Sequence, residues 1–159
     1  MADDRNMLAD LFKGLRTSPF VMIGLDDTPD HSQPMTAQLP EDDDGARHAV
    51  WFFMGSDNKL AIGGDAMAQY VGKGHQLFAC LHGRLSADND PAMIDALWSN
   101  QVAAWFPEGK SDPNLLLMRY DLNSAEIWEA DISLSGRFKM LFGGKIDPQE
   151  AGSHAELAL

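Results

Sequence analysis

Cysteine is nearly absent from this chain, and the sequence features of secretion and membrane insertion are missing. Its 159 residues include one cysteine, Cys80, so neither an internal disulfide nor a zinc cluster of several thiolates can form. Residues 1–4 lack the basic and then apolar pattern of a signal peptide. No apolar run approaches the roughly 20 residues needed to cross a bilayer. We therefore expect a soluble, cytoplasmic protein in a reducing compartment.

Positive charge is also scarce. The chain has 12 Lys and Arg residues against 24 Asp and Glu residues, which gives a formal net charge of -12. This charge repels nucleic acid backbones and anionic lipid surfaces, and no basic cluster interrupts it. We expect neither nucleic acid nor a membrane as a partner. A small anionic ligand is still compatible with the sequence, because one or two well-placed cations can bind it locally.

Patterns typical of metal sites and activated nucleophiles are missing as well. The five histidines show no HExxH spacing and share no helical face, which predicts no metal site. Cys80 and His82 would share one face of a strand, but no acid stands at a spacing that would orient them. A buried structural thiol is therefore the better interpretation of Cys80. The acidic run 41–44 lacks the ligand spacing of a calcium loop and is interpreted as solvated.

What the sequence does contain is enough apolar material for one globular domain. Hydrophobic residues make up 45% of the chain and charged residues 23%, which suits a single core in a chain of this length. We place this domain at residues 1–145 and interpret 146–159 as a polar, partly disordered tail. Within the domain, the apolar run 138–144 is compatible with a short helix that packs on a partner subunit.

Hydrophobic periodicity predicts a mainly β fold with few helices. Apolar residues at helical spacing predict an amphipathic helix over 3–16, and Asp90-Pro91 predicts the start of a second helix over 91–104. The run 66–71 is ambiguous between helix and strand, and the glycines around it favour a short strand. The polar segment 121–124 between two β-prone runs predicts a hairpin. The predicted strands are 20–25, 35–39, 50–54, 66–71, 77–85, 115–120 and 125–130.

Short polar turns join most of these six or seven strands. Parallel strands would need a crossover helix at each step, so the sequence favours an antiparallel barrel.

The segment 104–113 carries the strongest signal for a binding site. It ends a helical run with Trp105 and Phe106 and continues into a turn that contains Lys110. Aromatic side chains are costly to leave on a loop, whereas a planar ligand would give them a partner face and Lys110 would give an anion a counter-charge. As structural alternatives, Trp105 would cap the helix by packing on Phe106, and Lys110 would be a solvated turn lysine.

Several short motifs occur in a characteristic order along the chain. They are 33–38 (QPMTAQ), 51–56 (WFFMGS), Gly83 at the close of a strand, 97–99 (LWS) and 105–113 (WFPEGKSDP). Their order resembles the general stress protein 26 branch of the pyridoxamine 5'-phosphate oxidase-like family. The resemblance covers roughly residues 5–130, and its most specific part is 105–113.

This resemblance implies a split β-barrel that dimerises and holds flavin mononucleotide (FMN) at the dimer interface. In that family the segment that matches Met35-Thr36 and the strand end that matches 53–56 line the flavin. Lys59 is the nearest match to a lysine that often meets the phosphate. Gln33 stands where relatives commonly have Arg, and Met54-Gly55 stands where they often have Thr-Ser, so polar and cationic groups are fewer at the expected phosphate end.

Physical chemistry allows the same residues to form such a site. FMN needs a flat apolar slot, donors along its pyrimidine edge and an anion pocket. Aromatic and methionine side chains would supply the slot, Thr36 and Gln38 the edge, and Ser56 with Lys59 the anion pocket. Trp51 and Phe53 have an alternative role in the core or in a dimer interface. The candidate cofactor-binding residues are Gln33, Met35, Thr36, Trp51, Phe53, Met54, Gly55, Ser56, Lys59, Trp105 and Lys110.

Three functions remain open at this stage. The first is an FMN-dependent oxidoreductase with a small-molecule redox substrate. The second is a flavin- or phosphate-ligand-binding stress protein without turnover, and the third is a cofactor-free interaction module. No acid, base or nucleophile stands out on the substrate side, so no catalytic residue is assigned. Oxidation of pyridoxamine phosphate itself is disfavoured, because the chain shows no cluster of Arg and His for a second phosphate.

Overall fold

The computed structural model describes residues 2–43, 45–130, 143 and 152–159, and these form one antiparallel sheet with a few helices. The expectation of a mainly β fold with six or seven antiparallel strands is confirmed. The strands are β1 (Phe20–Leu25), β2 (Gln33–Thr36), β3 (Ala49–Gly55), β4 (Gly64–Val71), β5 (Leu77–Ala87), β6 (Leu115–Glu129) and β7 (Ser153–Ala158). The helices are α1 (Ala2–Thr17), α2 (Pro91–Leu97) and α3 (Asn100–Ala103), with 3-10 turns η1 (Lys59–Ile62) and η2 (Gly109–Ser111).

The sheet curls until its two end strands almost meet. Its strand order is β2-β1-β4-β5-β6-β3, with β7 beside β6, so β2 and β3 lie at opposite ends of the ladder. The ladder itself stays open there. A single bridge joins the two ends, in which Gln38 N donates to Trp51 O (2.7 Å) and Trp51 N donates to Gln38 O (3.0 Å). We call this place, between β2 and β3, the seam.

Strand β6 is the longest strand, with 15 residues, and it pairs along both of its edges. One edge pairs with β5, and the other is divided between β3 at residues 115–121 and β7 at residues 124–129. The predicted hairpin around 121–124 is therefore wrong. These polar residues continue the strand, and Leu122 N donates to His48 O (2.8 Å) where β6 passes from one partner to the other.

A bulge in β5 lets β6 run past it without a break. The pairing register shifts between His82 and Gly83. At Gly83 the two backbones come so close that an added Cβ would run into the carbonyl oxygen of Asp121 and lie 3.0 Å from the Tyr120 ring. Glycine is therefore required at this position because of close backbone approach.

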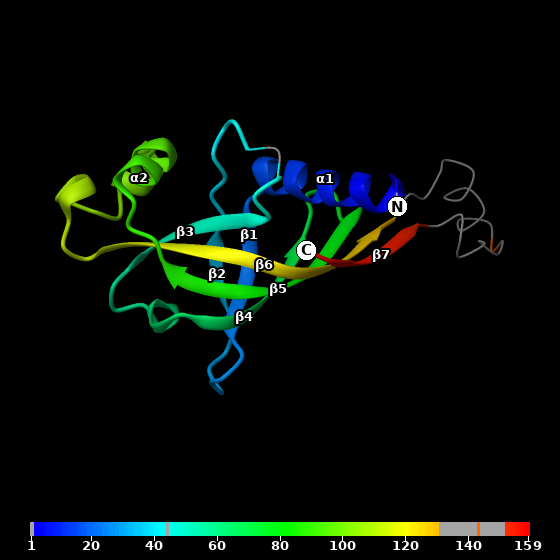
Figure 1. The fold of residues 1–159 in the computed structure, drawn as a ribbon, viewed down its shortest axis with the longest axis horizontal. Coiled ribbons are helices and arrows are strands. Elements are labelled where there is room, and N and C mark those ends of the chain that lie inside the picture. The colour runs from blue at the N-terminus through cyan, green and yellow to red at the C-terminus, as the bar shows by residue number, and fades with distance from the viewer. Residues whose placement is uncertain (1, 44, 131–142, 144–151) are drawn as a thin grey trace.

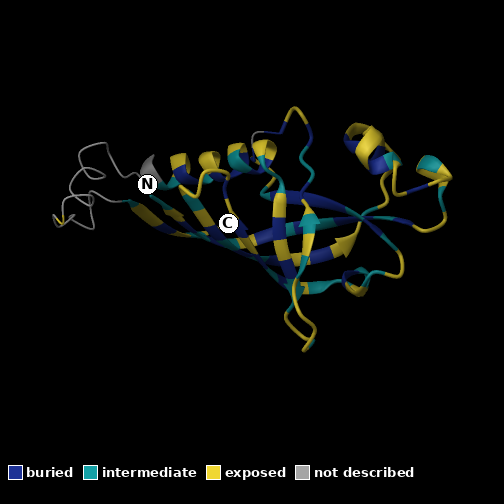
Figure 2. Cartoon of the chain, turned by 180° about the vertical axis from the view of Figure 1, so that it is seen from behind, coloured by how far each residue is buried: buried dark blue, intermediate teal, exposed yellow. Residues whose placement is uncertain are grey.

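The main core lies between α1 and the inner face of the sheet. Figure 1 shows α1 lying across one half of the sheet, on the side of β7. Its buried residues Met7, Leu11, Phe12 and Leu15 pack against alternate residues of the strands. The other strand residues face outward, and Figure 2 shows the resulting alternation of buried and exposed bands. The amphipathic helix predicted over 3–16 is thus confirmed.

Tyr120 ties three strands together inside this core. It is 0% exposed, and its hydroxyl lies 2.8 Å from Ala66 O in β4 and 3.0 Å from Leu81 O in β5. Burial raises the pKa of the Tyr120 phenol well above its usual value. The hydroxyl therefore remains a donor to these backbone acceptors over the whole physiological pH range.

A second cluster holds α2 and α3 at the other end of the sheet, away from α1 (Figure 1). The single helix predicted over 91–104 is wrong, because the backbone is extended at Trp98 and Ser99. Asp90 caps α2 as predicted, with Ala92 N donating to its carboxylate (3.1 Å). Ser99 then starts α3, since its hydroxyl accepts from Val102 N (3.2 Å). The break turns α3 toward the seam.

The C-terminal prediction needs a correction. Residues 153–158 are β7, paired with β6 along six register positions, so this part of the expected tail is ordered sheet. The reason is alternation: Ala155 is buried between the exposed His154 and Glu156. The helix expected within 138–144 and the proposed boundary at 145 fall almost entirely outside the described residues. Within the described chain, no helix combines the length and the apolar character that crossing a membrane requires.

Replacing Gly83 by alanine should destabilise the protein strongly. The new methyl group has no space beside the Asp121 carbonyl, so the backbones of β5 and β6 must move apart at Gly83. We expect a loss of roughly 2–3 kcal/mol in the free energy of unfolding, measured by urea denaturation. Gly72→Ala is a matched control, because its Cβ would meet its nearest neighbour, the Leu77 carbonyl oxygen, at 3.3 Å. Equal stability of the two variants would contradict the role of the close approach.

Candidate functional site

A pocket of about 540 Å³ lies at the seam of the sheet. It is bounded by β2 and the start of β1 on one side and by the end of β3 and α3 on the other. A pocket is expected here, because the ladder stops pairing between its two end strands. The described residues that line it are Phe20, Gln33, Pro34, Met35, Thr36, Gln38, Phe53, Met54, Gly55, Asp57, Asn58, Gln101, Val102, Trp105, Phe106 and Asn114.

One wall of the pocket is aromatic. Phe53 packs edge-on against Trp98, with ring centroids 6.0 Å apart, and it also contacts Phe106 at 6.5 Å. These contacts fix the orientation of Phe53 at the end of β3. By contrast, Phe20 and Trp105 line the pocket while remaining 65% and 81% exposed. Large aromatic surfaces left uncovered beside a pocket are typical of a site that awaits a ligand or a partner chain.

The polar groups of the pocket are almost all neutral. Five of its side chains are amides, each able to donate and to accept hydrogen bonds. Among the described lining residues there is one carboxylate, Asp57, and there is no Lys, Arg or His. The amides are Gln33, Gln38, Asn58, Gln101 and Asn114. Such a lining suits a ligand with several carbonyl and ring nitrogen groups better than a multiply charged one.

Asn114 organises the polar end of the pocket. Its Oδ1 accepts from both Ser56 N (3.1 Å) and Ser56 Oγ (2.8 Å), which holds the end of β3 to the start of β6. A Cβ added at Gly55 would lie 2.6 Å from Asp57 Oδ1 and 2.8 Å from Asn114 Nδ2. The absence of a side chain at Gly55 therefore lets the Asp57 and Asn114 side chains converge there.

The structure brings most of the residues expected from the sequence to this pocket. Gln33, Met35, Thr36, Phe53, Met54, Gly55 and Trp105 line it. Ser56 lies next to it, between two lining residues. Trp51 does not line the pocket, because it is 0% exposed in the second cluster, where its Nε1 donates to Asp88 Oδ2 (3.2 Å). Trp51 therefore has the alternative role given above, that of a core residue.

The two candidate lysines do not line the pocket. Lys59 is exposed, and its ammonium donates to the backbone carbonyl of His31 (2.5 Å). Lys110 forms an ion pair with Asp95 (2.8 Å), and its Nζ lies 5.9 Å from the centroid of the Trp98 ring. In this arrangement Lys110 fastens η2 to α2, beside the aromatic wall.

Sequence reasoning missed several lining residues, above all Gln101 and Asn114. Gln101 is in the short helix that follows the break at Trp98, and Asn114 is in the turn before β6. No apolar period marks either residue. The signal that would have found Asn114 is the Asp-Pro-Asn turn itself, in which Asn114 N donates to Asp112 Oδ1 (2.9 Å) and the chain is directed back to the end of β3.

These features define a class of protein. A curled antiparallel sheet with an aromatic and amide-lined pocket at its seam is suited to bind one small, flat, hydrogen-bonding molecule. The family follows from comparison with known proteins: a family model described as pyridoxamine 5'-phosphate oxidase like matches residues 3–148. The chain therefore belongs to the pyridoxamine 5'-phosphate oxidase-like family.

Solved structures agree with this assignment. The chain is 41% identical to the general stress FMN/FAD binding protein of Xanthomonas citri, with 82% of this chain and 93% of that chain covered and a TM-score of 0.74. A putative general stress protein 26 from Jannaschia sp. CCS1 has the same fold, with a TM-score of 0.82, 23% identity, and coverage of 98% and 99%. No curated protein matches the chain at a significant level. The split-barrel fold expected from the resemblance is thus confirmed.

Proposed function

We propose that this protein binds FMN in the seam pocket and acts as a flavin-dependent oxidoreductase on a small molecule. The observation that carries this proposal is the combination of an aromatic wall with a set of amide side chains in one pocket of about 540 Å³. That volume is in the range of small-molecule and cofactor sites. The 41% identity to a protein described as an FMN/FAD binding protein supports the same ligand class.

The pocket residues fit the flavin ring system. Phe53 and Met35 offer apolar surface within the pocket, and the exposed Trp105 offers a free aromatic face. The pyrimidine edge of a flavin presents both donors and acceptors, which amides such as Gln33 and Gln38 can match. In this binding mode the side chains orient the ring and exclude water from one of its faces.

The phosphate is the part of FMN with the fewest partners among the lining residues. The polar end of the pocket offers the Ser56 hydroxyl, but it also presents the Asp57 carboxylate. Lys59 directly follows the lining residue Asn58, and its exposed ammonium is held only by the His31 carbonyl among the contacts described. We propose that Lys59 exchanges this neutral acceptor for the phosphate, because a charge-assisted hydrogen bond is the stronger one.

Redox chemistry would come from the cofactor. A bound flavin supplies hydride or electron transfer, and the protein binds and orients it. Asp57 is the one titratable side chain among the described lining residues. This scarcity of acid and base groups favours, as a second candidate, a flavin-binding stress protein without turnover. The two candidate functions can be distinguished by reducing the protein-bound flavin and adding candidate electron acceptors. Reoxidation faster than that of free FMN supports the oxidoreductase.

We further propose that the protein is a homodimer with the flavin at the interface. An apolar row crosses the outer face of the sheet, where Val71 of β4 pairs in register with Phe78 of β5, and Phe20 and Met22 of β1 are exposed beside it. Phe20 also lines the pocket, so a second copy on this face would reach the ligand. A cytoplasmic location remains part of the proposal and is supported by the free thiol of Cys80.

Trp105→Ala should weaken FMN binding without unfolding the protein. Trp105 is 81% exposed, so its removal leaves the core intact while one stacking face is lost. We expect a dissociation constant raised roughly three- to tenfold, measured by quenching of flavin fluorescence. Ile62→Ala, at an exposed apolar residue that does not line the pocket, is the control. An unchanged constant in Trp105→Ala would remove Trp105 from the site.

Lys59→Ala should distinguish FMN from riboflavin, which lacks the phosphate. Loss of one exposed cation should weaken FMN about two- to fivefold and leave riboflavin unchanged, because only FMN carries the anion. Lys73→Ala removes a second exposed cation and should change neither constant. If Lys59→Ala weakened both ligands equally, the residue would act on the shape of the pocket and not on the phosphate.

The oligomeric state can be measured directly. Multi-angle light scattering of the purified protein should give twice the mass of the 17.5 kDa chain. Phe78→Glu should shift the mass toward that of one chain, because a charge is then placed within the apolar row. A wild-type protein that is monomeric at micromolar concentration and still binds FMN would contradict the interface site.

A further inference from the structure

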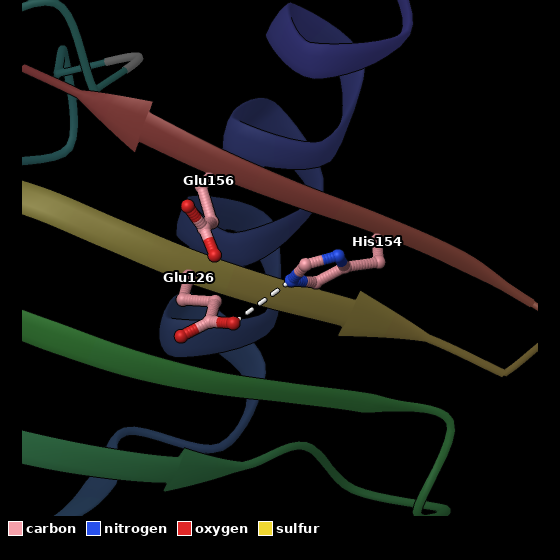
Figure 3. A group of neighbouring side chains, drawn as sticks. All are labelled: Glu126, His154 and Glu156. Carbon is pink, nitrogen blue, oxygen red and sulfur yellow. Dashed lines mark hydrogen bonds and ion pairs between the residues drawn. The ribbon is translucent and has the colours of Figure 1, made fainter.

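We propose that Glu126, His154 and Glu156 form a binding site for one divalent transition-metal ion of the zinc type. The three side chains project from β6 and β7 and point toward one another (Figure 3). Their candidate ligand atoms, one from each residue, all lie within 4.8 Å of one another. The site is separate from the seam pocket, whose lining includes none of the three residues. It therefore stands or falls independently of the flavin proposal.

Strand geometry explains why these ligands meet. Glu126 and Glu156 are register partners on adjacent antiparallel strands, and His154 is two residues from Glu156, hence on the same face of β7. This is the outward face, because Ala155 between them is buried. His154 Nε2 lies 2.9 Å from Glu126 Oε1. Zinc binds nitrogen and oxygen ligands at about 2.0–2.2 Å, so small side-chain rotations bring all three onto one ion.

The charge of the cluster favours a cation. Like charges directly opposite each other on neighbouring strands destabilise a sheet, and Glu126 and Glu156 are placed in that way. In the described part of the chain neither carboxylate is paired with a Lys or an Arg. The one ionic partner that the structure gives them is His154, bonded to Glu126. A divalent ion would neutralise both carboxylates at once.

The imidazole is already held in a ligating orientation. The His154 ring stacks on Trp128, with centroids 5.2 Å apart and an angle of 22° between the planes. This stacking restricts the rotation of the ring while Nε2 points at Glu126 (Figure 3). Ligands that are ordered before the ion arrives lose less conformational freedom on binding. Trp128 is therefore a positioning residue of the site.

The ligand types select the kind of ion. One imidazole nitrogen with two carboxylates suits zinc and its neighbours in the first transition row, whereas calcium and magnesium prefer oxygen ligands alone. Cys80 is the register partner of Glu126 in β5. The Cys80 sulfur lies 3.1 Å from the Met67 sulfur and is not among the ligand atoms that converge, so we do not include it among the ligands.

This proposal departs from the expectation of no metal site drawn from the sequence. That expectation considered HExxH and helical spacing. The two-residue spacing of His154 and Glu156 becomes informative only once 153–158 is known to be a strand, and Glu126 joins the two through sheet pairing across 28 residues. Neither relation is visible in a segment interpreted as a tail.

The test is zinc binding by the 159-residue protein, freed of metal with a chelator. Isothermal titration calorimetry with Zn²⁺ should show one ion per chain, and Co²⁺ should give a visible absorption band that Zn²⁺ displaces. His154→Asn and Glu156→Gln should each weaken binding about tenfold or more. The band is a readout that a purely structural role of these residues would leave unchanged. Glu156→Gln guards against misfolding, since Glu156 is exposed.

His82→Asn is the matched control. His82 Nε2 lies 2.8 Å from Asp26 Oδ2, in a second exposed histidine–carboxylate pair to which the described residues add no third ligand. The His82→Asn variant should bind Zn²⁺ with the same affinity as the wild type. The proposal is overturned if the wild type binds no Zn²⁺, if Glu156→Gln binds it unchanged, or if His82→Asn loses it. One ion per two chains, measured with the mass from light scattering, would also overturn a site built within one chain.

Discussion

The close approach of β5 and β6 at Gly83 is the constraint on which the rest of the structure depends. Because no side chain separates the two backbones there, β5 can bulge while β6 continues as one strand of 15 residues. A continuous β6 reaches from the second cluster, next to α2 and α3, to the main core beneath α1. The same strand therefore begins beside the ligand pocket, after Asn114. Near its other end it carries Glu126, one of the proposed metal ligands, and Trp128, which positions His154.

The seam gives the fold a place for a ligand without a hole in its core. A fully paired barrel would fill its interior with side chains and leave no edge. Here the ladder is interrupted between β2 and β3, and one bridge between Gln38 and Trp51 keeps the ends in register. Side chains from both ends then converge on the space between them. Phe53 and Met35 come from opposite ends of the strand order, yet they line the same pocket.

The sequence predicts those parts of the fold in which the local pattern and the tertiary partner agree. Helix α1 and strands β1 and β5 follow from periodicity, because each buries one face against the main core. Strand β3 follows from its continuous β-prone run, because it buries both faces, one against each cluster. The polar residues 121–124 look like a turn when considered alone. They remain in a strand since both edges of β6 are paired, an influence that comes from β3, β5 and β7 and not from neighbours in the chain. Trp98 and Ser99 break the second helix for a comparable reason: Trp98 packs on Phe53.

The sequence predicted those pocket residues that belong to a family motif, but not those that only the tertiary structure brings to the pocket. Met35, Thr36 and Phe53 belong to motifs in the sequence, and they line the pocket. Gln101 and Asn114 come to the pocket through the short helix and the turn before β6. Trp51 carries the same aromatic signal as Phe53 and, two residues away, lies on the same face of β3. It is fully buried in the second cluster, whereas Phe53 is only partly buried and reaches the pocket. Alternation gives both residues the same face and does not reveal which of them α2 and α3 cover.

The split edge of β6 has a consequence for the behaviour of the protein in solution. Strand β3 covers only the first half of that edge, and β7 covers the second half, where Ala125 and Ile127 are buried. With β7 displaced, a row of backbone amides and carbonyls would face water next to apolar side chains, which is a template for pairing with another chain. By pairing with this edge, β7 prevents β6 from pairing there with another chain. A long connection makes the pairing of β7 with β6 entropically costly, so an ion that binds β6 and β7 together would also oppose self-association through this edge.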